Sequence, residues 1–145
     1  MYQKIIAVGN LGRDPEMRYM PDGTAVTNFS IATTRAWTNK ATDEKEEETT
    51  WFRVNVWGRQ AETANQYLSR GRKVLVEGVL VPDRATGGPK TFTRQDGTVG
   101  AAFEIRADTV KFLSSRNDDD GAAPQERGSG ANGGVVSYEE DDVPF

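Results

Sequence analysis

The segment TTWFRVNVWGR (49–59) places aromatic and basic residues in regular alternation. Side chains of a β-strand point alternately to its two faces. One face of this strand is wholly apolar and consists of Phe52, Val54 and Val56. The other face carries Trp51, Arg53, Asn55 and Trp57, and Arg59 follows just beyond. Because an indole can stack on any nucleic-acid base, at about 1–3 kcal/mol per base, and arginine pairs with phosphate, the pattern predicts a base-stacking platform.

Two further aromatic residues are interleaved with basic ones. Trp37 lies two residues after Arg35, on the same face of its strand, and Phe92 lies between Lys90 and Arg94. We therefore expect one continuous aromatic and basic surface on neighbouring strands and hairpins. One alternative is a protein–protein scaffold whose tryptophans pack beneath loops or in a subunit interface. Another is an RNA-binding module, because the sugar 2′-OH is recognised by details that the sequence does not show.

The elements that must position these residues are short strands separated by turn residues. The five expected strands are Lys4–Val8, Ala25–Trp37, Trp51–Trp57, Val74–Val81 and Ala102–Val110. Between the third and fourth, Ala61, Ala64 and Leu68 recur at helical spacing, and Gly71 is the expected helix stop. Five strands with one short helix in this place is the element order of an all-β OB-fold barrel. An immunoglobulin-like sandwich needs about seven strands.

Three polar segments are expected to be connections. GNLG (9–12) is interpreted as a turn, because its glycine spacing fits no phosphate-binding loop. TNKATDEKEEETT (38–50) is expected to be an exposed hairpin tip, with its acids at 43–48 in solvent. PDRATGGPKTFTRQDGTVG (82–100) is expected to be a long hairpin between the last two strands.

The composition argues against an enzyme. The 145 residues include no Cys and no His, so the chain lacks a disulfide framework, a thiolate metal site and the commonest general base. No carboxylate pair is placed in a plausible cleft, and the DDD at 118–120 is interpreted as solvated linker rather than a metal site. We therefore expect no catalytic residue, no metal and no cofactor.

Hydropathy predicts a cytoplasmic protein. No stretch approaches the roughly 18 apolar residues of a membrane span. Met1 runs directly into YQKIIAVGN, which lacks the basic region and apolar run of a signal peptide.

Charge and composition divide the chain near residue 113. Residues 1–113 carry 16 Lys and Arg against 14 Asp and Glu, whereas residues 114–145 carry 2 against 8. The first part is therefore a mildly basic folded body, which is compatible with phosphate binding. Residues 114–136 are rich in Gly, Ala, Ser and charge and are expected to be a disordered linker.

The segment SYEEDDVPF (137–145) combines four acids with an apolar last residue. We expect Phe145 to be a hydrophobic plug for a partner pocket, with Pro144 stiffening its approach and the acids steering it to basic partners. The predicted partner-binding residues are Asp141, Asp142, Val143, Pro144 and Phe145. The alternative is an inert solubilising tail.

Four segments together resemble the bacterial single-stranded DNA-binding protein (SSB) family. They are VGNLGRDPEMRYMPDG (8–23), WFRVNVWGR (51–59), YLSRGRKVLVEG (67–78) and DDVPF (141–145). The resemblance implies an OB-fold in residues 1–113 that assembles as a homotetramer and wraps single-stranded DNA without sequence preference. It also implies a nucleoid-associated protein of DNA replication, repair and recombination, whose tip recruits DNA-maintenance proteins such as helicases.

The resemblance also assigns roles to residues. Base stacking falls on Trp37, Trp51, Trp57 and Phe92. Phosphate contacts fall by position on Lys4, Arg18, Arg53, Arg59 and Arg70. Charge and location alone add Arg35, Lys73 and Arg94.

Overall fold

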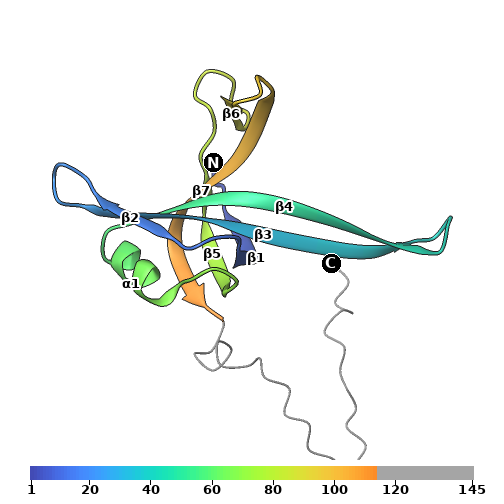
Figure 1. The fold of residues 1–145 in the computed structure, drawn as a ribbon, viewed down its shortest axis with the longest axis horizontal. Helices are drawn as coiled ribbons and strands as arrows, with labels where there is room; N and C mark the ends of the chain where they lie inside the picture. The colour runs from blue at the N-terminus through green and yellow to red at the C-terminus, as the bar shows by residue number, and fades with distance from the viewer. Residues whose placement is uncertain (114–145) are drawn as a thin grey trace, which may run out of the picture.

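Strands account for most of the computed structural model, which describes residues 1–113. The strands are β1 (Ile5–Leu11), β2 (Glu16–Tyr19), β3 (Ala25–Asn39), β4 (Glu44–Trp57), β5 (Lys73–Leu80), β6 (Lys90–Thr93) and β7 (Val99–Phe112). A single helix in these residues, α1 (Arg59–Tyr67), lies between β4 and β5 (Figure 1). The expected linker at 114–136 and tip at 137–145 lie outside the described residues.

Five of the strands form a closed barrel. Their order is β1-β5-β7-β4-β3, and β1 pairs with β3 again through Asn10↔Ala32 and Leu11↔Ile31. The β4–β7 pair is parallel, whereas β1–β5, β5–β7 and β3–β4 are antiparallel. The two short strands add to this frame, β2 on β3 and β6 on β7. The predicted OB-fold, with five barrel strands and one helix, is confirmed.

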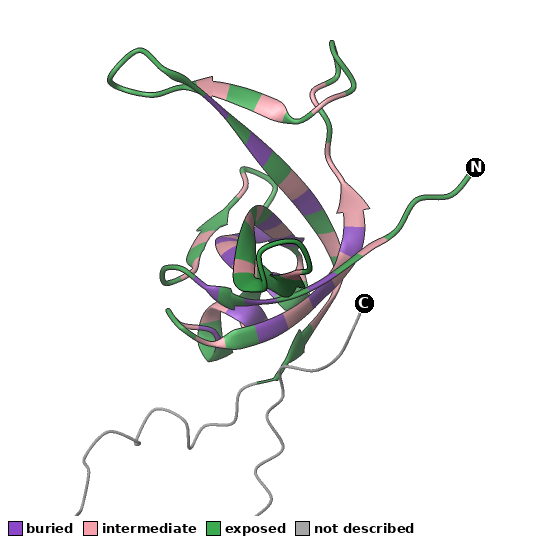
Figure 2. Ribbon diagram, turned by 90° about the vertical axis from the view of Figure 1, so that its right-hand side faces the viewer, coloured by how far each residue is buried: buried purple, intermediate pink, exposed green. Residues whose placement is uncertain are grey.

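The barrel is filled by side chains that point inward from alternate positions along each strand. The most completely buried large apolar residues of this core are Ile31, Val54, Val56, Val74, Val76 and Ile105. Buried and exposed residues alternate along the strands (Figure 2). Ala61, Ala64 and Leu68 are buried in the same core, as their spacing predicted. The helix is held further by the buried Thr27, whose hydroxyl donates to the Ala61 carbonyl at 2.6 Å.

The helix ends before its predicted stop. Leu68 takes an extended conformation (φ −92°, ψ 145°) and inserts its side chain into the core, which ends the helix at Tyr67. Gly71 (φ 86°) serves the next turn instead, where its N–H donates to the Leu11 carbonyl at 2.9 Å. The prediction of Gly71 as the helix stop is therefore wrong. No helix in residues 1–113 is long and apolar enough to cross a membrane.

Two expected connections are partly strand. β1 continues through Gly9 to Leu11, because the last residues of this strand close the barrel against β3, so GNLG is not a turn. The β3–β4 pairing continues to Asn39↔Glu44, so the acids at 44–48 lie on a strand and the tip is only residues 40–43. This two-stranded arm projects from the barrel (Figure 1) and most of its acidic side chains are exposed, as expected.

The close crossing of β5 and β7 depends on Gly78. The register of this pair shifts between Glu77 and Gly78, and a methyl group on Gly78 would collide with the Arg106 carbonyl oxygen. We expect Gly78→Ala to lower the free energy of unfolding in urea by about 1–3 kcal/mol, because backbone cannot move away as a side chain can. Gly88→Ala is the matched control, since its methyl would find only Thr86 Oγ1 at 3.6 Å. Equal stability of the two variants would contradict this account.

Candidate nucleic-acid interface

The outward row of β4 lies where the alternation placed it. Trp51 and Trp57 are 54% and 45% exposed, whereas Val54 and Val56 are buried. The ring of the half-buried Phe52 packs against Phe103, with centroids 6.0 Å apart. The two indoles are therefore surface groups, with the core strand beneath them.

Gly12 supports the indole of Trp51. A Cβ on Gly12 would lie 2.6 Å from Cζ3 and 2.8 Å from Cη2 of Trp51, so only a glycine leaves room for the ring. The Gly12 N–H donates to the Ser30 carbonyl at 3.1 Å, which fixes this backbone to β3. One part of the indole thus rests on a fixed backbone while the rest of its surface faces solvent.

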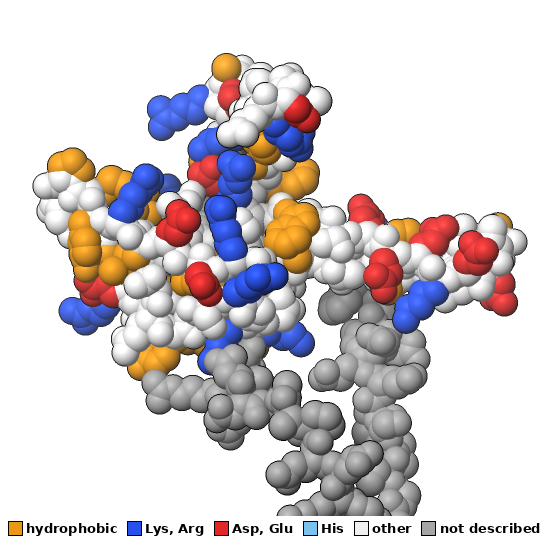
Figure 3. All heavy atoms as spheres, in the orientation of Figure 1, with side chains coloured by type: hydrophobic (Ala, Val, Ile, Leu, Met, Phe, Trp, Pro, Cys, Tyr) orange, Lys and Arg blue, Asp and Glu red, His pale blue; other side chains and the backbone are white. Residues whose placement is uncertain are grey.

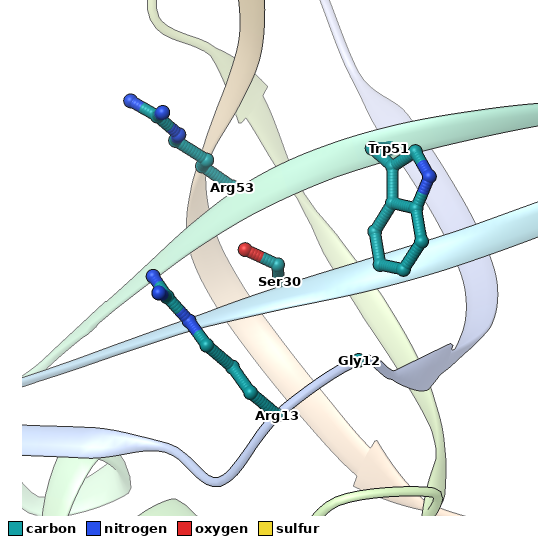
Figure 4. A pocket seen from close by; sticks show the side chains of 5 residues that line it. All are labelled: Gly12, Arg13, Ser30, Trp51 and Arg53. Carbon is teal, nitrogen blue, oxygen red and sulfur yellow. The ribbon is translucent and has the colours of Figure 1, made fainter. Parts of the chain in front are cut away.

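An open hollow of about 290 Å³ lies beside this indole, lined by Gly12, Arg13, Ser30, Trp51 and Arg53. Arg13 and Arg53 extend to one side of it with the Ser30 hydroxyl between them, and Trp51 stands on the other side (Figure 4). Arg13 is a residue that the sequence reasoning missed. Its position in an irregular segment carries no strand alternation, and only the closure of β1 on β3 brings it to β4.

The β6–β7 hairpin brings Phe92 to the same surface. Arg53 lies 4.8 Å and Arg94 5.3 Å from the Phe92 ring centroid, which are cation–π distances. Phe92 pairs with Gly100, where a Cβ would come within 2.6 Å of Phe92 Cζ. Arg53 therefore connects the hairpin to the tryptophan row, and part of the Phe92 ring is already covered by guanidinium groups.

The turn of this hairpin is held by a carboxylate. Asp96 Oδ1 accepts hydrogen bonds from the hydroxyl and the N–H of Thr98, at 2.6 and 3.0 Å. These bonds lower the pKa of Asp96 below its usual value, the side-chain bond most strongly. The carboxylate is thus charged at neutral pH and fixes the turn that carries Phe92.

One carboxylate lies within the aromatic and basic surface. Glu104 is adjacent to Arg53 in the β4–β7 register, and its side chain is only 17% exposed. It accepts hydrogen bonds from Asn55 at 2.7 Å and from Lys90 at 3.1 Å. Asn55 and Lys90 are therefore both hydrogen-bonded to Glu104. The positive charge of Lys90 compensates the negative charge of Glu104 beside Arg53.

Trp37 is separated from the other aromatic residues. The unbroken β3–β4 register pairs Trp51 with Ala32 but Trp37 with Glu46, which places the two indoles on opposite faces of the ribbon. Trp37 is 40% exposed, and the Arg35 guanidinium lies 5.3 Å from its ring. The structure thus gathers Trp51, Trp57 and Phe92 around Arg53, whereas the β3–β4 register directs Trp37 to the other face of the projecting ribbon.

Two predicted phosphate ligands are engaged by carboxylates. Lys4 Nζ lies 3.1 Å from Glu77 and 3.2 Å from Asp108, and hydrogen bonds to these groups, Glu77 first, raise its pKa. Arg35 forms an exposed ion pair with Glu48 at 2.8 Å.

The remaining predicted cations are distributed around the barrel. Arg18 on β2 and Trp57 on β4 both pair with Val26 of β3, so they lie on either side of that residue. Arg59 begins α1, Arg70 lies in the turn before β5, Lys73 begins β5, and Arg94 follows β6. Basic side chains gather over the central body on one face, while acids follow the β3–β4 arm (Figure 3). Within residues 1–113 no group of three His, Cys, Asp or Glu side chains could hold a metal ion.

Comparisons with known proteins agree on one family. The single-strand binding protein family matches residues 2–113. Proteins from Neisseria meningitidis serogroup A and serogroup B strains, both named single-stranded DNA-binding protein, are 41% identical over 127 residues, which cover 88% of this chain and 68% of theirs. A solved structure of a Plasmodium falciparum SSB complex with ssDNA is similar with a TM-score of 0.62 at 25% identity, covering 79% of this chain and 97% of that one.

The support of Trp51 by Gly12 can be tested by fluorescence. The chain has three tryptophans, so in a W37F/W57F background Trp51 is the sole indole. We expect Gly12→Ala to push the ring off the backbone, red-shifting its emission and increasing its quenching by acrylamide. Because an exposed ring can turn away, stability should fall by less than the roughly 1–3 kcal/mol of core overpacking. Gly88→Ala in the same background is the control, and unchanged quenching in Gly12→Ala would contradict the contact.

Proposed function

The chain belongs to the single-strand binding protein family, and from that premise we propose that it binds single-stranded DNA without sequence preference. The observation that carries this proposal is the row of exposed Trp51 and Trp57 with Arg53 between them, joined through Arg53 to Phe92. Stacking accepts any base, because every base has a π face. The Neisseria meningitidis relatives are named single-stranded DNA-binding protein, and the similar Plasmodium falciparum structure is an SSB complex with ssDNA.

The proposed mechanism consists of binding without a chemical step. Unstacked bases lie on Trp51, Trp57 and the accessible part of Phe92, which selects single strands over duplex. Phosphates are met by basic side chains with release of counterions, so affinity falls as salt rises. The proposed phosphate ligands are Arg18, Arg53, Arg59, Arg70, Lys73 and Arg94. Lys4 and Arg35 can join them only by leaving their carboxylates, and Trp37 can join only from the other face of the ribbon.

We place this activity in DNA replication, recombination and repair, as the binding function of a nucleoid-associated cytoplasmic protein that keeps strands open. We also propose a homotetramer. Ile6 and Val8 on β1 are exposed apolar residues. Within residues 1–113, β1 pairs with β3 only at its last two residues, so the edge of β1 opposite β5 is largely unpaired there. An unpaired strand edge next to apolar side chains is suited to pairing with another copy of the chain.

The C-terminal segment is proposed to recruit partner proteins. Its acids at 139–142 and the apolar Phe145 fit a partner pocket with an apolar floor and a Lys or Arg rim. The proposed contacts are Asp141, Asp142, Val143, Pro144 and Phe145. The partners are expected among proteins of DNA maintenance, such as helicases and recombination mediators.

Titration with poly(dT) tests the binding proposal. We expect strong quenching of indole fluorescence that saturates at a fixed nucleotide ratio, with log K falling linearly as log salt rises. Trp51→Ala should lose about 1–3 kcal/mol of binding free energy. Matched DNA and RNA oligomers in competition provide the control for ligand class. Binding to duplex DNA more tightly than to poly(dT) would refute the proposal.

Deletion of residues 139–145 tests the recruitment proposal. We propose that the four acids at 139–142 also compete with DNA for the basic surface. The deletion should therefore tighten DNA binding at low salt, while binding to a helicase or recombination mediator is lost. Phe145→Ala is the matched variant, because it keeps all four acids: DNA affinity should stay constant while partner binding is lost. Partner binding that survives the deletion would rule out the plug.

A further inference from the structure

We infer that the hollow between Trp51, Arg13 and Arg53 is a subsite for one nucleotide of the bound strand, in which the two guanidinium groups hold the same phosphate. This inference rests on the proposed function and deepens it, because Arg13 belongs to none of the contacts assigned above. The base of that nucleotide would lie on the Trp51 indole and its phosphate between the two arginines, which stand on the side of the hollow opposite the indole (Figure 4).

Arg13 is held in place from both sides. The N–H of the preceding residue, Gly12, donates to the Ser30 carbonyl at 3.1 Å. The following residue, Asp14, accepts the N–H of Arg70 on its Oδ1 at 2.8 Å. These two bonds anchor the backbone of Gly12 and the side chain of Asp14, so the Arg13 side chain starts from a defined point beside the indole.

Arg13 and Arg53 differ from Lys90, the neighbouring cation of this surface, in their charge balance. Lys90 is paired with Glu104. Within residues 1–113 neither Arg13 nor Arg53 forms an ion pair, and Glu104, the carboxylate nearest Arg53 in register, is already engaged by Asn55 and Lys90. Two uncompensated guanidinium groups on one hollow favour a shared anion, and their fork geometry suits phosphate oxygens.

The other walls of the hollow fit the rest of a nucleotide. Arg53 is restrained by the Phe92 ring at 4.8 Å, and its register partner Ser30 presents a hydroxyl between the arginines. Trp51 supplies a flat apolar wall that Gly12 keeps in position. The hollow is open rather than enclosed, so a strand can enter and leave it. An anion joined to a flat ring within a continuing chain is the chemistry of a phosphodiester-linked nucleotide.

The salt dependence of poly(dT) binding by full-length variants tests this subsite. Arg13→Gln should weaken binding roughly three- to tenfold near 0.1 M salt and reduce the magnitude of the slope of log K against log salt by about one phosphate contact. Lys111→Gln is the matched control, because it removes one positive charge from β7 at its pairing with Leu75, away from the hollow. The inference is overturned if Arg13→Gln and Lys111→Gln behave alike.

Two further measurements identify the phosphate as the shared ligand. Arg13→Gln and Arg53→Gln combined should lose less than the product of their separate effects, since each alone already disrupts the same contact. On an oligomer whose backbone carries uncharged methylphosphonates, Arg13→Gln should bind like the unmodified protein. Full multiplicativity, or an undiminished loss on the uncharged backbone, would overturn the shared-phosphate subsite. Failure of the unmodified protein to bind poly(dT) at all would instead refute the proposed function.

Discussion

The β3–β4 register is the constraint on which the rest of the binding surface depends. It runs without a break from Val26↔Trp57 to Asn39↔Glu44. Burial of Ile31 and Val54 pins it, because a slip of one residue would turn every side chain to the other face. The same register that directs Trp51 and Arg53 outward also carries Trp37 to the opposite face of the projecting arm.

The aromatic rings of Trp51 and Phe92, near Arg53, are each held in position by close contact with the backbone of a glycine. Trp51 rests on Gly12 and Phe92 lies over Gly100, and in both places a Cβ would come within 2.6 Å of the ring. Both glycines lie where separate elements meet, Gly12 where β1 closes on β3 and Gly100 in the β6–β7 pair. The rings are therefore oriented before a ligand arrives, which reduces the ordering cost of stacking.

The charge of the binding surface depends more on which side chains form ion pairs than on the net charge of the folded body. The body is only slightly basic, and the acids of the β3–β4 arm lie apart from the central basic face (Figure 3). Carboxylates engage Lys4 and Arg35, which removes two candidate phosphate ligands from immediate use, and Glu104 likewise engages Lys90 on β6. Within residues 1–113 Arg13 and Arg53 form no ion pair and line a hollow beside an exposed indole, so their positive charge is available to an anion there.

The sequence by itself determined the barrel, the helix between its third and fourth strands, and the outward direction of Trp51, Arg53 and Trp57. Those features follow from local alternation and spacing, which one strand or one helix displays alone. It did not determine that β1 continues through GNLG, that Leu68 ends the helix, that Trp37 lies on the opposite ribbon face, or that Arg13 shares a hollow with Arg53. Only the tertiary structure decided these, because each depends on pairing or packing between segments that the sequence separates.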